Sequence, residues 1–135
     1  MTIAQYLAEW LSDYGSLEID TNHITDGADQ YGLFRAPTRL IQEMNDGSYE
    51  ITEYFNFFAR QASVTEGDRQ DSDQWLEDLC YWVDDYPFSY DYPDPGGDRT
   101  VTLISINGVP YAMETDSDDT LYQFSITITY TRERG

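Results

Sequence analysis

The strongest constraint on the fold is the stretch at residues 120–134, TLYQFSITITYTRER, in which apolar and polar side chains alternate. Successive side chains of a β-strand point to opposite faces, so this alternation predicts a strand with one face in the core and one polar face. The predicted core face is Tyr122, Phe124, Ile126, Ile128 and Tyr130. The predicted polar face is Gln123, Ser125, Thr127 and Thr129.

A second strong strand is predicted from Tyr49 to Arg60, with aromatic residues on both of its faces. One face would hold Tyr49, Ile51, Phe55 and Phe57, and the other Thr52, Tyr54, Asn56 and Phe58. Aromatic side chains on both sides indicate that neither face is freely solvated. The preceding Asn-Asp-Gly at 45–47 is typical of a hairpin turn. Before it, residues 31–43 read as an extended arm or strand interrupted by Pro37, which belongs on an edge or outside a sheet.

Two helices are expected from apolar spacing. Residues 2–14 carry one stripe: Ile3, Tyr6, Leu7, Trp10 and Leu11. Residues 66–86 carry another: Trp75, Leu76, Leu79, Trp82, Val83 and Tyr86. Acidic residues crowd the first half of this second helix, where they stabilise the positive end of the helix dipole. Pro87 is predicted to end it.

The remaining strands complete the expected fold class. Residues 16–24 alternate like a strand, and residues 99–106 and 109–115 read as two strands joined by a turn at Asn107-Gly108. The sequence therefore predicts an α+β fold of two layers, a mainly antiparallel sheet of about five to six strands with two helices packed on one face. At 135 residues, we expect a single domain over 1–135.

The charge excludes several classes of partner. There are 26 acidic residues against 7 basic ones, all arginine, for a net charge of −19. Such a surface repels nucleic acid and anionic membranes, so we expect specific binding to neither. No signal peptide or membrane-spanning run is visible, which predicts that the chain is cytosolic where it is made. The acidity could simply maintain solubility, or it could imitate DNA.

Residues with catalytic or metal-binding potential are sparse. Cys80 stands alone within an apolar helical pattern, and His23 is the single histidine. Asp68, Asp71 and Asp73 lack the glycine that an EF-hand loop needs at its sharp turn. Pairs of carboxylates for glycoside hydrolysis could be chosen anywhere among so many acids, so they identify nothing. We expect no catalytic residues, no metal site and no cofactor.

The acidic aromatic stretch DDYPFSYDYPDPGGD at residues 84–98 is open to several interpretations. Its prolines stiffen the backbone, and its aromatic residues offer contact area at low entropic cost. We interpret it as a contact loop for a neighbouring subunit or another protein. A plain exposed connection, a metal-binding loop and a sugar-binding surface remain alternatives.

The order of these segments resembles a known family. The chain contains TIAQYLAEWL, GSLEID, YGLFRAP, YEITEYFNFFARQ, WLEDLCYWVDD and YQFSITITYTRE in sequence. In order and length it is similar to the small tail-terminator and minor-capsid (head–tail joining) proteins of tailed bacteriophages, from a phage or prophage. This family has no catalytic signature, so the resemblance implies no enzyme activity and transfers no motif.

The resemblance implies a structural role in virion assembly. Such proteins form a ring, commonly a hexamer, at the head-proximal end of the tail, where they end tail-tube polymerisation and join the tail to the head. The implied partners are other copies of the chain, the tail-tube protein and the head connector or adaptor. The implied location is the bacterial cytoplasm during assembly and then the tail or neck of the virion. Features of this sequence that could supply the contacts are Arg35, Arg39, Tyr54, Phe57, Phe58, Phe88, Tyr90 and Tyr92.

Two other functions remain open at this point. An acidic DNA mimic, or another protein-binding inhibitor, would array its carboxylates on one outer face at the spacing of a duplex backbone. A small binding module or enzyme would use the 84–98 loop and would be stabilised by calcium or an oligosaccharide.

Overall fold

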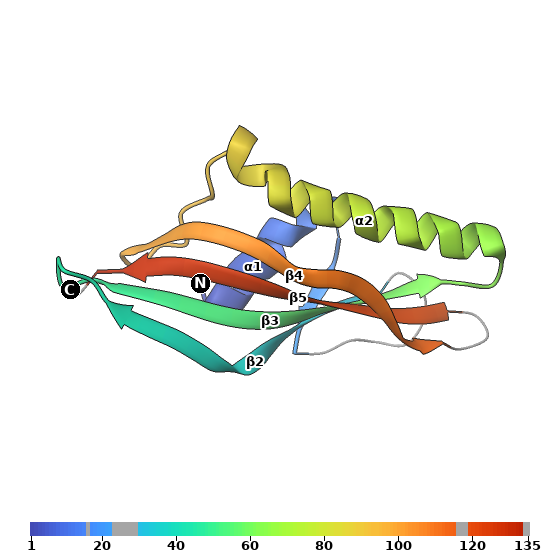
Figure 1. The fold of residues 1–135 in the computed structure, drawn as a ribbon, viewed down its shortest axis with the longest axis horizontal. Helices are drawn as coiled ribbons and strands as arrows, with labels where there is room; N and C mark the ends of the chain where they lie inside the picture. Colours follow the sequence, from blue (N-terminus) through green and yellow to red (C-terminus); the bar gives the residue numbers. More distant parts are fainter. Residues whose placement is uncertain (16, 23–29, 116–118, 134–135) are drawn as a thin grey trace.

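A computed structural model describes residues 1–15, 17–22, 30–115 and 119–133 (Figure 1). The elements in chain order are α1 (Ile3–Ser12), β1 (Ile19–Thr21), β2 (Gln30–Glu43), β3 (Tyr49–Ala62), α2 (Glu66–Ser89), β4 (Arg99–Thr115) and β5 (Asp119–Arg132). The five strands form one sheet in the order β1-β2-β3-β5-β4. Only the short β1–β2 pair is parallel. The predicted α+β class and the mainly antiparallel sheet are confirmed.

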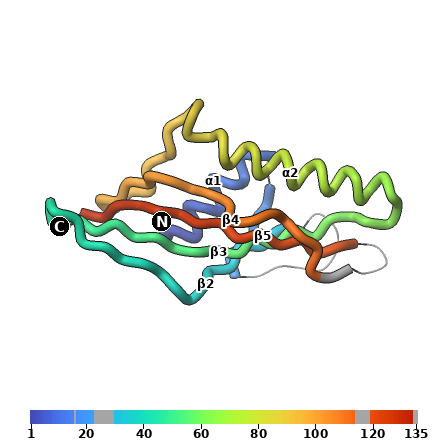
Figure 2. Tube along the Cα trace, viewed as in Figure 1, coloured from blue at the N-terminus to red at the C-terminus, as the bar shows by residue number. Residues whose placement is uncertain are grey.

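Both helices pack on the same face of the sheet, as predicted. Buried residues of α1 and α2 form one core cluster with the buried residues of the strands. The two helices also contact each other, since the ring centroids of Trp10 and Trp82 lie 4.7 Å apart. Figure 2 shows β5 running between β3 and β4, with α2 along the β4 side of the molecule. The helices therefore leave the opposite face of the sheet uncovered.

The register of β3 and β5 confirms the predicted alternation. Phe57 lies opposite Phe124, and both rings are buried and stacked with centroids 4.9 Å apart. Tyr54 lies opposite Thr127, and these side chains belong to the uncovered face. Side chains two residues apart share a face, so this one register decides the environment of every residue in both strands.

The ends of the helices follow from their caps. Thr2 and Gln5 form a capping box before α1, and Thr65 and Asp68 form one before α2. The prediction that Pro87 ends the second helix is wrong, because α2 continues to Ser89. A proline removes one backbone hydrogen bond, and so near a helix end it is tolerated when the next turn closes. Here the Tyr90 N–H donates to the Tyr86 carbonyl at 2.9 Å.

The prediction of two strands joined at Asn107-Gly108 is also wrong. β4 is one strand that pairs with β5 on both sides of this point, with Asn107 opposite Ser125 and Tyr111 opposite Gln123. Gly108 has a φ of +78°, which glycine adopts without strain. The extra residues form a bulge in β4 instead of reversing the chain, so the sheet has five strands.

The outer half of β2 is a free edge of the sheet. β1 pairs only with Tyr31–Leu33, and the register between β2 and β3 is irregular between Arg35 and Arg39. Pro37 lies in this irregular stretch, on the edge where the sequence predicted it, and Figure 1 shows the bend of β2 there. The strand expected at residues 16–24 is limited to Ile19–Thr21 within the described residues.

Candidate protein-binding surfaces

The uncovered side of the sheet, which we call the open face, is built from alternate residues of three strands. Its members are Thr52, Tyr54, Asn56 and Phe58 of β3, Gln123, Ser125, Thr127 and Thr129 of β5, and Leu103, Ser105, Asn107 and Tyr111 of β4. These central side chains carry no charge, although the whole chain has a net charge of −19. Charged residues of the same alternation, Glu50 and the Arg60–Asp119 ion pair, lie at the ends of the two central strands. The central strands hold these side chains half-buried against one another.

Hydrogen bonds join the polar side chains of the open face across the strands. The Thr52 and Thr129 hydroxyls lie 3.2 Å apart, and the Ser125 hydroxyl donates to the Asn56 side-chain oxygen at 3.1 Å. The Tyr111 hydroxyl donates to the side-chain oxygen of Gln123 at 3.0 Å. The polar groups therefore satisfy one another, which lowers the cost of removing water from this surface.

Aromatic and aliphatic side chains lie beside the hydrogen-bonded polar side chains of the open face. Phe58 meets Phe34 of β2 edge to face, with ring centroids 5.1 Å apart. Leu40 is 57% exposed and Tyr111 is 54% exposed at the two margins. Depletion of charge together with exposed aromatic residues is the composition found at the centre of protein interfaces. The open face is therefore the surface of this chain best suited to bind another protein.

A second candidate surface lies at the β2 edge, on the side of the sheet that the helices cover elsewhere. Glu53 is buried there and accepts a hydrogen bond from the Tyr130 hydroxyl at 2.7 Å. Arg35 lies 3.5 Å from the same carboxylate and over the Phe55 ring. Burial, and then the hydrogen bond to Glu53, raise the pKa of Tyr130 to about 12. The tyrosine therefore stays protonated as a donor at neutral pH.

Arg39 lies beside this buried group without an ion pair among the described residues. An open cavity of about 500 Å³ is lined by Asn22, Arg35, Ala36, Pro37, Arg39 and Glu53. We call it the basic cavity, because its two guanidinium groups outnumber its one carboxylate. Arginine binds carboxylates through two parallel hydrogen bonds, so this cavity can accept an acidic side chain from a partner.

The acidic aromatic stretch at 84–98 divides into a packed part and an exposed part. Tyr86 and Tyr92 pack on Trp10 with ring centroids at 5.0 and 6.0 Å. Phe88 is 88% exposed and Tyr90 is 65% exposed. Only these two rings are free to contact a partner, so the stretch is partly a structural part of the helix layer.

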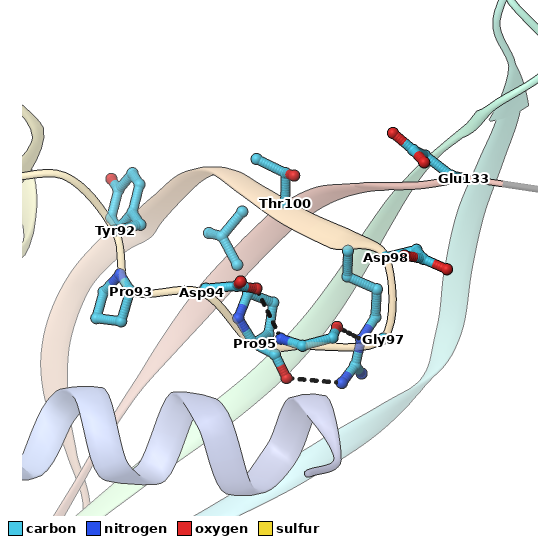
Figure 3. A pocket seen from close by; sticks show the side chains of 11 residues that line it. Tyr92, Pro93, Asp94, Pro95, Gly97, Asp98, Thr100 and Glu133 are labelled. Atoms are coloured by element: carbon cyan, nitrogen blue, oxygen red, sulfur yellow. Dashed lines mark hydrogen bonds between the residues drawn. The ribbon is translucent and has the colours of Figure 1, made fainter.

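The loop at the end of this stretch lines an open cavity. It measures about 540 Å³ and lies between Tyr92 and Val101, with Glu133 at its rim (Figure 3). The Arg99 guanidinium donates to the backbone carbonyls of Gly96 at 2.9 Å, Pro95 at 3.0 Å and Met1 at 2.7 Å. These bonds turn the arginine toward the backbone, so its role is to tie the loop to the start of the chain.

A third candidate surface is a groove between α2 and the bulge of β4. It has a volume of about 410 Å³, and its lining includes Leu76, Cys80, Tyr81 and Val109, with acidic residues around them. Burial, followed by the charges of Asp84 and Glu77, raises the pKa of the Cys80 thiol to about 11. Such a thiol is a poor nucleophile at neutral pH.

The structure distributes the eight predicted interface residues over separate places. Arg35 and Arg39 line the same cavity, and Tyr54 and Phe58 lie on the open face. Phe88 is exposed in the last turn of α2, and Tyr90 is exposed directly after it. The prediction that Phe57 belongs to an interface is wrong, because its side chain is 0% exposed in the core and offers no surface to a partner. Tyr92 is half-buried against Trp10.

Sequence reasoning missed Glu53 as the partner of Arg35, and Tyr130 as the hydrogen-bond donor to Glu53. The available signal was the position of Glu53 between Ile51 and Phe55 on the core face of β3. A carboxylate at such a position needs hydrogen-bond or charge partners, because burial of an unpaired charge is costly. The sequence could have raised that question, although it could not name the partners.

Within the described residues, no group of three or more His, Cys, Asp or Glu side chains could hold a metal ion. His23 lies outside the described residues. In the same described part of the chain, no helix is long and apolar enough to cross a membrane.

Comparison with known proteins gives no family for this chain. No protein-family model matches the sequence, and no curated protein matches it.

Proposed function

We propose that this chain is a structural virion protein that assembles as a ring at the head-proximal end of a phage tail, ends growth of the tail tube and joins tail to head. The observation that carries this proposal is the uncharged centre of the open face in a chain with a net charge of −19. A protein that acted alone in water would gain nothing from keeping its charges away from the centre of one sheet face. A protein that binds others through that face avoids burying charge.

The test removes the gene from the phage or prophage that carries it and examines the lysate by electron microscopy. We expect overlong tails without heads, and restoration of normal virions by the wild-type chain. A variant with Tyr54→Glu and Thr127→Glu places two like charges opposite each other on the open face and should fail to restore them. Gln70→Glu on an exposed part of α2 is the control and should restore them.

Two results would contradict the proposal. One is normal virions in the absence of the gene, and the other is full restoration by the open-face variant. Circular dichroism must show that the variant is folded, so that a failure to restore reports on binding and not on stability.

A DNA mimic remains the second candidate, because one specific feature favours it. α2 carries acidic residues along most of its length: Glu66, Asp68, Asp71, Asp73, Glu77, Asp78, Asp84 and Asp85. A helix of this kind can present carboxylates to a basic nucleic-acid enzyme. Reversal of Asp71, Asp78 and Asp85 to lysine would abolish such inhibition, whereas the open-face variant would leave it intact.

A further inference from the structure

We propose that neighbouring copies of this chain meet head to tail, with the groove between α2 and β4 of one copy seated on the Arg35–Ile41 edge of β2 in the next. This inference rests on the proposed function, because it specifies the contact that would build the ring. The two surfaces lie at opposite sides of the sheet, since β4 is one outer strand and the outer half of β2 is the other free edge (Figure 1).

The groove presents apolar side chains inside a ring of negative charge. Leu76 is buried at its base, and Tyr81 and Val109 are 54% and 76% exposed. Asp73 and Asp84 are exposed at its rim and make no ion pair among the described residues. A surface of this kind fits an aliphatic side chain flanked by cations.

The β2 edge offers that combination. Arg35 and Arg39 flank the bend of the strand, and Ile41 follows with 50% of its surface exposed. Register places Ile41 beside Ile51, which is 4% exposed on the face that the helices cover. Ile41 thus faces the helix side of the sheet, at a place where no helix of the same copy covers it. An α2 helix from a neighbouring copy would complete that layer.

Charge favours this pairing over contact between two equivalent surfaces. Two grooves brought together would oppose Asp73 and Asp84 to their own copies, and two β2 edges would oppose arginines. The mixed contact instead brings each guanidinium toward an unpaired carboxylate. The chain has 7 basic residues against 26 acidic ones, so few other places could offer two arginines to an acidic surface.

The strand directions also agree with a ring. β2, β3, β5 and β4 are antiparallel in succession, so the two outer strands β2 and β4 run in opposite directions. Register places Ile41 level with Val101 and the groove level with residues 32–34, so the rotation axis that seats the edge in the neighbouring groove is inclined to the strands. A contact between two different surfaces repeats from copy to copy and closes into a ring when the rotation allows.

The contact uses side chains and does not extend the sheet at the middle of β4. There the backbone N–H of Ile104 is already taken, because it donates to the Tyr92 hydroxyl at 3.2 Å. The stretch at 90–98 thus blocks strand addition at this point and leaves the groove farther along β4 as the available surface.

Cys80 in the groove allows a direct test by disulfide cross-linking. The variant Ile41→Cys places a thiol on the edge, and mild oxidation of the full-length chain should link it to Cys80 of the next copy. The product expected on a non-reducing gel is a ladder that extends beyond the dimer. Gln42→Cys is the matched control, because the side chain of residue 42 points to the opposite side of the sheet from that of Ile41. It should give at least several-fold less product.

The ladder must also disappear when Cys80→Ser is combined with Ile41→Cys. A dimer that persists in that background would show two β2 edges meeting each other and would overturn the proposal. Absence of any linked product, together with unchanged assembly of the charge variants Arg39→Glu and Asp84→Arg, would overturn it as well.

Charge exchange gives a second readout that does not depend on thiol reactivity. Arg39→Glu alone and Asp84→Arg alone should each reduce the mass-average size in light scattering, and the two together should restore it. If the wild type assembles and none of these variants changes its mass, the ring stands and this contact is wrong. If the wild type stays monomeric at all concentrations and the Ile41→Cys variant forms no ladder, both proposals fail.

Discussion

The neighbouring phenylalanines of β3 provide the sharpest test of a sheet with one covered face. Phe57 is 0% exposed and stacks on Phe124 at 4.9 Å, whereas Phe58 is half-buried on the open face and meets only the edge of Phe34 at 5.1 Å. Phe57→Ala should therefore cost about 3–5 kcal/mol, the usual range for a fully buried phenylalanine. Phe58→Ala should cost about 1 kcal/mol, since it loses one aromatic contact and part of its buried area.

Urea unfolding followed by tryptophan fluorescence measures the difference. Trp10 and Trp82 lie in the helix–sheet core and report its loss. With a denaturant slope of about 2 kcal/mol per molar urea, the midpoint should fall by about 2 M for Phe57→Ala and by about 0.5 M for Phe58→Ala. A loss of 3–5 kcal/mol is also a large share of the roughly 5–15 kcal/mol that stabilises a domain, so part of the first variant could be unfolded in water.

Equal shifts for the two variants would refute the reasoning. They would mean that both faces of β3 are covered to the same degree in the isolated chain. A larger shift for Phe58→Ala would reverse the assignment of core and open face.

Three other perturbations test separate parts of the structure. Tyr130→Phe should destabilise the chain by about 2 kcal/mol at pH 7 in urea titrations, because it removes a hydrogen bond to the buried Glu53 carboxylate. The pKa of Tyr130 is raised from 10.0 to about 12 on folding. Its contribution is therefore present below pH 10 and lost between pH 10 and 12, so wild-type stability should fall more steeply there than that of Tyr130→Phe. Thr65→Ala should cost about 1 kcal/mol through loss of the α2 capping box, and a melting temperature unchanged by this variant would contradict that role. Raising NaCl from about 0.1 M to about 1 M shortens the screening length from about 10 Å to about 3 Å, so the melting temperature should rise as the carboxylates of α2 repel one another less.

The parts of the fold that sequence predicts well are those governed by side-chain alternation. Tyr122 to Tyr130 and Ile51 to Phe57 keep a strict period of two, and one register then places them all on the core face. The helix stripes around Trp10 and Leu79 were equally clear, because each needs a covered surface along its whole length. Each position of such a pattern repeats the same requirement for a buried side chain, so one unusual residue does not hide the pattern.

Single-residue signals were less reliable. Pro87 and Gly108 are typical of a helix end and a turn, yet the helix closes one further turn and β4 continues through a bulge. In α2 a local hydrogen bond from Tyr90 to Tyr86 closes the last turn, whereas in β4 pairing with β5 outweighs the turn preference of Asn107-Gly108. The cluster of Arg35, Glu53 and Tyr130 joins three strand positions that only the sheet register brings together, so no local pattern could reveal it.

The central place of β5 has a consequence for the order in which the molecule forms. β2 and β3 can fold as one hairpin and β4 and β5 as another, but the sheet becomes continuous only when β5 pairs with β3 (Figure 2). That seam joins strands separated by the whole of α2 and β4, which makes it the slow, non-local step of folding. A nascent chain on the ribosome therefore holds an incomplete core until β5 emerges. Truncated products would lack the open face as well as the core, so translation itself would keep defective subunits out of any assembly.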